Sequence, residues 1–292
     1  MNIADYVALT KPKIIPLLLM VAFGSAVVAA RGIPPILTLT GVIAAGTVAS
    51  AGALALNSYL EIDVDSKMRR TRSRPLPSQR IVPASHALLL GLGLLAFGVA
   101  IAAETLNLLA TFFIALGAFI YVPIYTLWLK PRTSWNIVLG GFAGSCAALS
   151  GWYAVAGISL TGESFVVAWI LAALVFVWTP SHFWSLAVIT EEDYSAAGIP
   201  MLPSVLGSAA ASRYIVTNTL LLIPVSLLFA IYLSGIGLWV YLLFTVIFGA
   251  ILLWTNLKLL RSPNKDNAWL AFKFSSPYLA VIFLVAMIAA VI

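Results

Sequence analysis

Nine long stretches of this chain contain almost no charged side chains, and they constrain its fold more than any other feature. Each is close to the roughly 20 apolar residues that a helix needs to cross a bilayer. Asp, Glu, Lys and Arg make up only 9% of the 292 residues, against about 25% in an average soluble domain. The sequence therefore predicts an all-α integral membrane protein, with one transmembrane domain over residues 1–292. The predicted spans run approximately over residues 14–30, 36–60, 84–103, 106–128, 136–156, 164–188, 212–234, 236–259 and 269–292.

The basic residues fall on one side of this nine-span arrangement. Of the 16 Lys and Arg, only Arg31 is left for the other side. Because loops rich in Lys and Arg stay in the cytoplasm, the amino terminus is predicted to be cytoplasmic. The loops near residues 57–83 and 187–208 then face the cytoplasm as well, and the cell membrane is the expected location. The lipid bilayer is an expected partner, and nucleic acid is not.

The first acidic group follows the second predicted span directly. Asn57, Glu61 and Asp65 are four residues apart, so a continuing helix places them on one face, with Asp63 on the opposite side. Carboxylates at this spacing repel each other, and a divalent cation bound between them makes the net electrostatic interaction attractive. Carboxylate and amide oxygens suit Mg²⁺, which binds one or two carboxylates and completes its shell with water and phosphate.

A basic group comes immediately after these acids. Guanidinium groups match phosphate oxygens in paired hydrogen bonds, so an acidic and a basic group in succession predict a site for a metal-bound diphosphate. The alternative is a solvated loop whose charges only set the topology and touch anionic lipid. The basic residues are Lys67, Arg69, Arg70, Arg72 and Arg74.

A second acidic group, Glu191, Glu192 and Asp193, follows the sixth predicted span. Acids at the carboxyl end of a helix meet the negative end of its dipole, which is unfavourable unless a cation compensates. Lys130 and Arg132 follow the fourth span on the same predicted side. They are expected either to share in diphosphate binding or to serve only as topology anchors.

Two histidines and one cysteine complete the candidates. His182 lies among aromatic residues in the part of the sixth span nearest the second acidic group. Polar groups at membrane depth are usually functional, although a hydrogen-bonded packing role is the alternative. His86, at the mouth of the third span, is expected to be an interfacial surface residue, and Cys146 an inert buried thiol.

Together these motifs resemble the UbiA superfamily of membrane prenyltransferases. Its first motif, N-D-x-x-D-x-x-x-D, stands here as Asn57, Ser58, Glu61 and Asp65. Within the superfamily the chain is most similar to the heme-farnesylating branch. The features that carry this finer likeness are T-K-P-K at 10–13, N-x-x-x-E-x-D-x-D at 57–65, M-R-R-T at 68–71, R-P at 74–75, L-K at 129–130, P-S-H-F-W at 180–184 and D-Y-x-x-A-G-I-P-M-L-P at 193–203.

The resemblance implies a bundle of nine helices around a central cavity, with both acidic motifs at its cytoplasmic end. It implies transfer of farnesyl from farnesyl diphosphate to a vinyl group of heme B, giving heme O, which a downstream heme-modifying enzyme could receive. The residues that the resemblance implies are Asn57, Glu61, Asp65 and Asp193 for Mg²⁺, and Lys13, Arg70, Arg74, Lys130 and Arg132 for the diphosphate. Glu61, Asp65, Asp193 and His182 are then the expected catalytic residues. For His182 the expected role is to contact the porphyrin, to ligate its iron or to direct a water.

The chain departs from the superfamily pattern at three places, of which one is Ala147 and Ala148 in the fifth predicted span, where relatives often carry proline that shapes the acceptor pocket. Ser58 stands where many relatives have Asp, and Ile189 takes the first place of the second motif, D-x-x-x-D, so that Glu191 or Glu192 could compensate. The nearest alternative is a UbiA-type enzyme that acts on a quinone, a chlorophyll or an archaeal lipid. A secondary transporter is a distant alternative, because transporters place their site near the bilayer midplane whereas the charged groups of this chain gather at one face. A purely structural subunit is the other alternative, but it leaves the aligned carboxylates unexplained.

Overall fold

A computed structural model describes residues 2–158 and 161–292, and every regular element within these ranges is helical. The elements are α1 (Ile3–Leu9), α2 (Ile15–Ala30), α3 (Ile36–Leu60), α4 (Ile62–Lys67), α5 (Ser85–Thr105), α6 (Leu108–Phe119), η1 (Ile120–Leu129), α7 (Asn136–Gly140), α8 (Phe142–Ala156), α9 (Gly162–Ile189), α10 (Glu191–Ala196), α11 (Leu202–Leu206), α12 (Ser208–Leu228), η2 (Phe229–Tyr232), α13 (Gly235–Arg261) and α14 (Lys265–Val291).

Eight helical segments of the described chain are long and apolar enough to cross a membrane. The first predicted span corresponds to α2, which has 16 residues and rises only about 24 Å, short of a hydrocarbon core of about 30 Å. It nevertheless packs against α8 and α14 within the bundle. The all-α membrane fold is thus confirmed, and all nine predicted stretches coincide with helices to within four residues, while the count of nine crossings stays a prediction.

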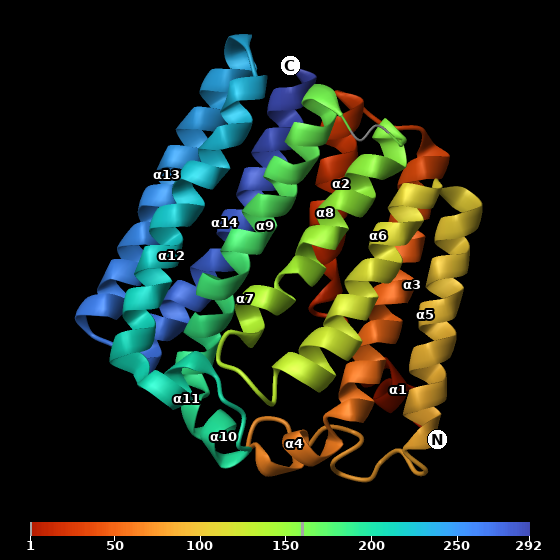
Figure 1. Ribbon diagram of the computed structural model, residues 1–292, viewed down its shortest axis with the longest axis vertical. Coiled ribbons are helices and arrows are strands. Elements are labelled where there is room, and N and C mark those ends of the chain that lie inside the picture. Colours follow the sequence, from red (N-terminus) through yellow and green to blue (C-terminus); the bar gives the residue numbers. More distant parts are fainter. Residues whose placement is uncertain (1, 159–160) are drawn as a thin grey trace.

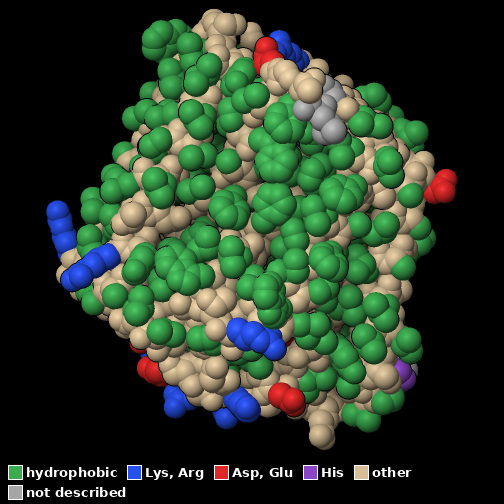
Figure 2. Space-filling model, in the orientation of Figure 1, with side chains coloured by type: hydrophobic (Ala, Val, Ile, Leu, Met, Phe, Trp, Pro, Cys, Tyr) green, Lys and Arg blue, Asp and Glu red, His purple; other side chains and the backbone are tan. Residues whose placement is uncertain are grey.

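The long helices run side by side as a bundle, and the short helices α1, α4, α10 and α11 lie at one end of it (Figure 1). We call this the motif end, defined by α1, α4, α10 and α11. The carboxyl end of α14 lies at the opposite end (Figure 1). In the space-filling view, hydrophobic side chains cover the flank of the bundle and most of the visible charged side chains lie toward the motif end (Figure 2). Such an apolar flank is what lipid requires of the outer helices.

Helix α2 approaches α8 closely at Gly151. A Cβ atom at this position would lie 1.8 Å from the carbonyl oxygen of Ala22. Backbone contact of this kind is typical of membrane helices, where small residues permit close packing. The contact fixes the spacing between α2 and α8.

We therefore expect Gly151→Ala to lower the free energy of unfolding by about 1–3 kcal/mol, because the added methyl group forces α2 and α8 apart. The measurement is the thermal unfolding temperature of the purified protein in detergent. Gly93→Ala is the matched control, since a Cβ there meets no heavy atom within 4 Å. Equal unfolding temperatures for the two variants would contradict the close approach of these helices.

Candidate active site

Asn57, Glu61 and Asp65 form a buried row where α3 continues into α4. The N–H of Glu61 donates to the carbonyl of Asn57 at 3.1 Å, and the N–H of Asp65 donates to that of Glu61 at 2.7 Å. The helical pattern thus continues through the junction. The three residues are 2%, 6% and 3% exposed, whereas Asp63 is exposed to solvent. The predicted shared face, with Asp63 directed away from it, is confirmed.

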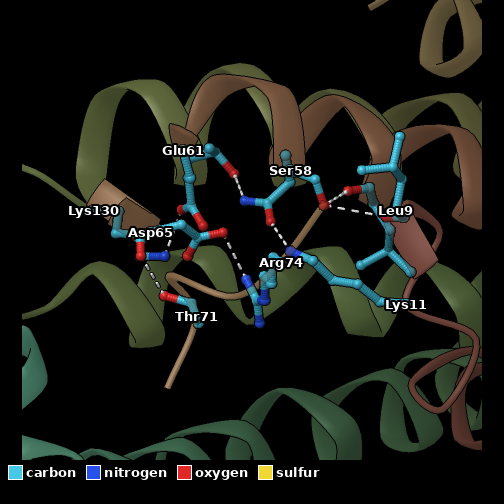
Figure 3. Close-up of polar contacts among 11 residues, drawn as sticks. Leu9, Lys11, Ser58, Glu61, Asp65, Thr71, Arg74 and Lys130 are labelled. Carbon is cyan, nitrogen blue, oxygen red and sulfur yellow. Dashed lines mark hydrogen bonds and ion pairs between the residues drawn. The ribbon is translucent and has the colours of Figure 1, made fainter. Parts of the chain in front are cut away.

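Asn57 joins three parts of the bundle at this row. Its Oδ1 accepts a hydrogen bond from Nζ of Lys11, in the loop between α1 and α2. Its Nδ2 donates to Oγ1 of Thr126 on η1 at 3.0 Å. The neighbouring Ser58 donates from Oγ to the carbonyl of Leu9 at 3.1 Å (Figure 3). The serine at the position of the motif aspartate therefore ties α1 to α3.

Glu61 forms a buried ion pair with Lys130, whose Nζ donates to Oε1 (Figure 3). Lys130 follows η1, a π-helix that contains Pro123, and its N–H donates to the carbonyl of Tyr125, five residues back, at 2.9 Å. This wide winding delivers the lysine to the row. Burial opposes both charges, but their mutual attraction lowers the pKa of Glu61 and raises the pKa of Lys130. Both groups are therefore ionised at neutral pH.

Asp65 holds the loop that follows α4 against the row. Its Oδ2 accepts a hydrogen bond from Nη1 of Arg74 at 2.8 Å, and its backbone carbonyl accepts one from Oγ1 of Thr71 at 2.9 Å (Figure 3). The Arg74 side chain is 32% exposed, against 4% for that of Asp65. The guanidinium thus reaches from the carboxylate to the solvent-facing side of the site.

Asp193, on α10, connects the second acidic group to this same loop. Its two carboxylate oxygens accept the backbone N–H groups of Arg69, at 2.9 Å, and Arg70, at 3.3 Å. The two acidic groups therefore meet at the motif end, as the sequence predicts. Asp193 reaches the row through the loop backbone rather than by a direct contact that the structure records.

The two glutamates of the second group contact other elements. Glu191 accepts a hydrogen bond from Oγ of Ser208, at the start of α12, at 2.5 Å. Glu192 pairs with Nζ of Lys265, at the start of α14, at 2.7 Å. Both contacts anchor α10, so the structure gives neither glutamate the position of the acid that Ile189 replaces. Within the described ranges, no three His, Cys, Asp or Glu side chains are placed to share one metal ion.

The structure sorts the five predicted diphosphate-binding residues into two sets. Arg74 and Lys130 contact the row, whereas Lys13, Arg70 and Arg132 have exposed side chains. The guanidinium of Arg132 donates to two backbone carbonyls at the end of η1, at 2.9 and 3.0 Å. Arg132 therefore caps a helix in this state of the protein.

Lys11 is the site residue that the sequence does not single out. It stands two positions before Lys13, and the pattern T-K-P-K contains no signal that distinguishes the two lysines. Its backbone adopts the left-handed region, with φ of 46°, which turns the chain between α1 and α2. This turn and the contact with Asn57 identify Lys11 as a residue of the site.

Residues 17–289 match the UbiA prenyltransferase family. The chain belongs to this family. The expected membrane prenyltransferase class is thereby confirmed.

Two relatives of this UbiA-family chain carry a more specific name. Protoheme IX farnesyltransferase 1 of Cenarchaeum symbiosum is 46% identical over 288 residues, which cover 97% of this chain and 94% of the relative. Protoheme IX farnesyltransferase of Sulfurisphaera tokodaii is 42% identical over 298 residues, with 100% and 94% covered. The solved structure of a UbiA homologue from Archaeoglobus fulgidus bound to DMAPP and Mg²⁺ matches with a TM-score of 0.70 at 14% identity, over 98% of this chain and 99% of that one. At this identity the structural match shows the shared fold.

His182 of this UbiA-family chain is buried between two aromatic rings. Its ring centroid lies 4.4 Å from that of Trp178 and 4.6 Å from that of Phe272, and both pairs are stacked. Its Nδ1 lies 2.5 Å from Oγ of Ser275 on α14. The packing role left open by the sequence is thus present. Any contact with a substrate falls to Nε2, because Nδ1 is already engaged.

The remaining two candidates match their expected surroundings. His86 is half-buried at the start of α5, and its Nδ1 lies 3.2 Å from the hydroxyl of Tyr6. Cys146 is a buried free thiol. Neither residue contacts the buried row.

The position of Lys11 gives the UbiA-family protein a predicted pH dependence. Burial lowers the pKa of Lys11 from 10.5 to about 8. Between these values the unfolded chain binds more protons than the folded one, so folding stability rises with pH in that window. We expect the unfolding temperature of the wild type to rise from pH 8 to 10 relative to Lys11→Met, which lacks this group. Lys258→Met, at an exposed position, is the control. A wild-type curve parallel to that of Lys11→Met would contradict the desolvation of the Lys11 ammonium group.

Proposed function

We propose that this protein transfers the farnesyl group of farnesyl diphosphate to a vinyl group of heme B, in a Mg²⁺-dependent reaction that gives heme O. One observation carries the proposal. The buried row Asn57, Glu61 and Asp65, matched by cationic side chains, lies in a chain that is 46% identical over nearly its full length to Protoheme IX farnesyltransferase 1.

The donor set of the row suits Mg²⁺. It offers two carboxylates and one amide oxygen, all buried, and leaves the remaining ligand positions to phosphate and water, which is how proteins commonly bind this ion. We assign Asn57, Glu61 and Asp65 to the metal, with Asp193 holding the loop beside them. Magnesium bound there supplies a Lewis acid that stabilises the charge developing on the diphosphate.

Three cations of the chain are placed to bind the diphosphate. Lys11, Lys130 and Arg74 come from three different segments and converge on the row. Fixed positive groups at a developing anion are among the largest contributions to catalysis because they need no reorganisation during the reaction. Arg70, at the exposed rim of the same loop, extends this positive surface toward an arriving diphosphate.

The apolar interior of the bundle serves the hydrocarbon half of the reaction. As the allylic C–O bond breaks, its electron pair leaves with the diphosphate, and exclusion of water protects the farnesyl cation from early capture. The π electrons of the heme vinyl group form the new C–C bond. Water then adds to the resulting cation and loses a proton, which leaves a hydroxyl group. We assign His182 to the porphyrin side of the site, where Nε2 contacts the ring, its iron or this water.

The charge distribution supports a location in the cell membrane with the motif end toward the cytoplasm. The basic loops gather on that side, and such loops are retained in the cytoplasm. Farnesyl diphosphate is water-soluble at its head group. A site at this end therefore receives the diphosphate from solution and the chain from the bilayer.

The test is incubation of membranes containing this protein with heme B, farnesyl diphosphate and Mg²⁺, followed by mass spectrometry of the porphyrin. We expect a product heavier than heme B by one farnesyl and one hydroxyl group, and none when Mg²⁺ is chelated. Unchanged heme together with a prenylated quinone or lipid from the same membranes would overturn the assignment of heme as the acceptor.

A further inference from the structure

Each side chain that the proposed function assigns to a metal ion already has one oxygen in contact with a positive side chain. Lys11 holds Asn57 and Lys130 holds Glu61. Arg74 holds Asp65 at 2.8 Å (Figure 3). A divalent cation that binds at the row must therefore displace these positive groups or be repelled by them.

Displacement costs little only if each cation finds another anion. The row and its partners hold three positive groups against two carboxylates, an excess of one positive charge. A magnesium ion alone raises that excess to three in a buried setting, where charge is poorly screened. A complex of magnesium with a fully ionised prenyl diphosphate carries about one negative charge, so it brings the site to neutrality.

The attachment of the three cations favours such an exchange. Lys11 lies in the loop before α2 and Arg74 in the loop after α4, while Lys130 directly follows η1. Each reaches the row by a long side chain from outside the membrane-spanning helices. A change of rotamer can therefore move its charged group from a protein oxygen to a phosphate oxygen without moving a helix.

We infer that the metal ion and the prenyl diphosphate bind this site as one unit, and that Lys11, Lys130 and Arg74 are internal counter-ions which pass from the row to the diphosphate. The inference rests on the proposed function for the assignment of the row to a metal–diphosphate complex. It adds Lys11 to the diphosphate-binding residues and explains why no carboxylate of the row is left without a cation.

The experiment measures thermal unfolding of the full-length protein in detergent with Mg²⁺ alone, inorganic pyrophosphate alone, and both together. For the wild type we expect the unfolding temperature to rise by less than about 1 °C with either ligand alone. With both ligands, at concentrations well above the dissociation constant of their complex with the protein, we expect a rise of about 5 °C or more. An equal shift with Mg²⁺ alone and with both ligands would overturn the inference.

Two variants test the counter-ions themselves. In Lys130→Gln the carboxylate of Glu61 is released, so Mg²⁺ alone should bind at least about tenfold more tightly than to the wild type. Lys11→Gln is the second variant, because it leaves no unpaired charge on the neutral Asn57 and should fold normally. Lys258→Gln, on the exposed surface, should behave as the wild type. Unimproved binding of Mg²⁺ alone in both Lys130→Gln and Lys11→Gln would overturn the inference.

These measurements contain neither heme nor a prenyl chain. Joint binding of metal and pyrophosphate without farnesylation of heme would overturn the proposed acceptor and support the present inference. If the protein farnesylates heme but binds Mg²⁺ as well without pyrophosphate as with it, the proposed function is supported and the counter-ion exchange is overturned.

Discussion

Lys130→Met is expected to destabilise this protein by about 3–5 kcal/mol, because it leaves a buried carboxylate without its counter-ion. The side chains of Lys130 and Glu61 are only 11% and 8% exposed, so water cannot replace the lost ammonium group. The effect exceeds that of an exposed ion pair, which contributes at most about 1 kcal/mol. The measurement is the unfolding temperature in detergent, where a shift of about 2–4 °C per kcal/mol is expected.

A double variant separates the pair from the packing around it. Lys130→Met combined with Glu61→Gln removes both charges, and replacement of a buried pair by neutral groups is often close to neutral for stability. We expect the double variant to recover most of the lost stability while remaining inactive, since the row has lost a carboxylate. A single Lys130→Met variant that unfolds at the wild-type temperature would show that the pair is solvated.

Asp65→Asn is expected to lower the rate of heme farnesylation by at least about 100-fold while the protein stays folded. The amide keeps an oxygen that can accept from Arg74, and the backbone contact to Thr71 does not depend on the side chain. The negative charge offered to the metal is lost, however, and removal of one stabilising electrostatic group from an active site costs about 10²–10³ in rate.

Asp63→Asn is the matched control for this prediction. Asp63 lies two residues away on the exposed side of the same short helix, so the substitution removes the same charge outside the row. We expect its product formation, measured by mass spectrometry of the porphyrin, to equal that of the wild type. Normal turnover in Asp65→Asn would remove the metal assignment of the row.

The membrane fold and the first half of the site could be predicted from local sequence patterns. Long apolar runs define the helices because each must satisfy its backbone hydrogen bonds within lipid, and all nine runs coincide with helices. The spacing of Asn57, Glu61 and Asp65 predicts their common face because helical periodicity is a property of the local backbone. The contrast with Asp63 follows from the same periodicity.

Only the tertiary structure decided which charged groups meet. The contact between Lys11 and Asn57 joins residues 46 positions apart, that between Lys130 and Glu61 joins residues 69 apart, and Asp193 meets the backbone of Arg69 across 124 positions. Lys13 carries the same charge as Lys11 yet is exposed. No local pattern ranks the two, because their difference arises from the backbone turn at Lys11 and from its contact with the distant Asn57. Composition and periodicity thus determined the helices and the acidic face, whereas the pairing of charges at that face depended on how distant segments pack together.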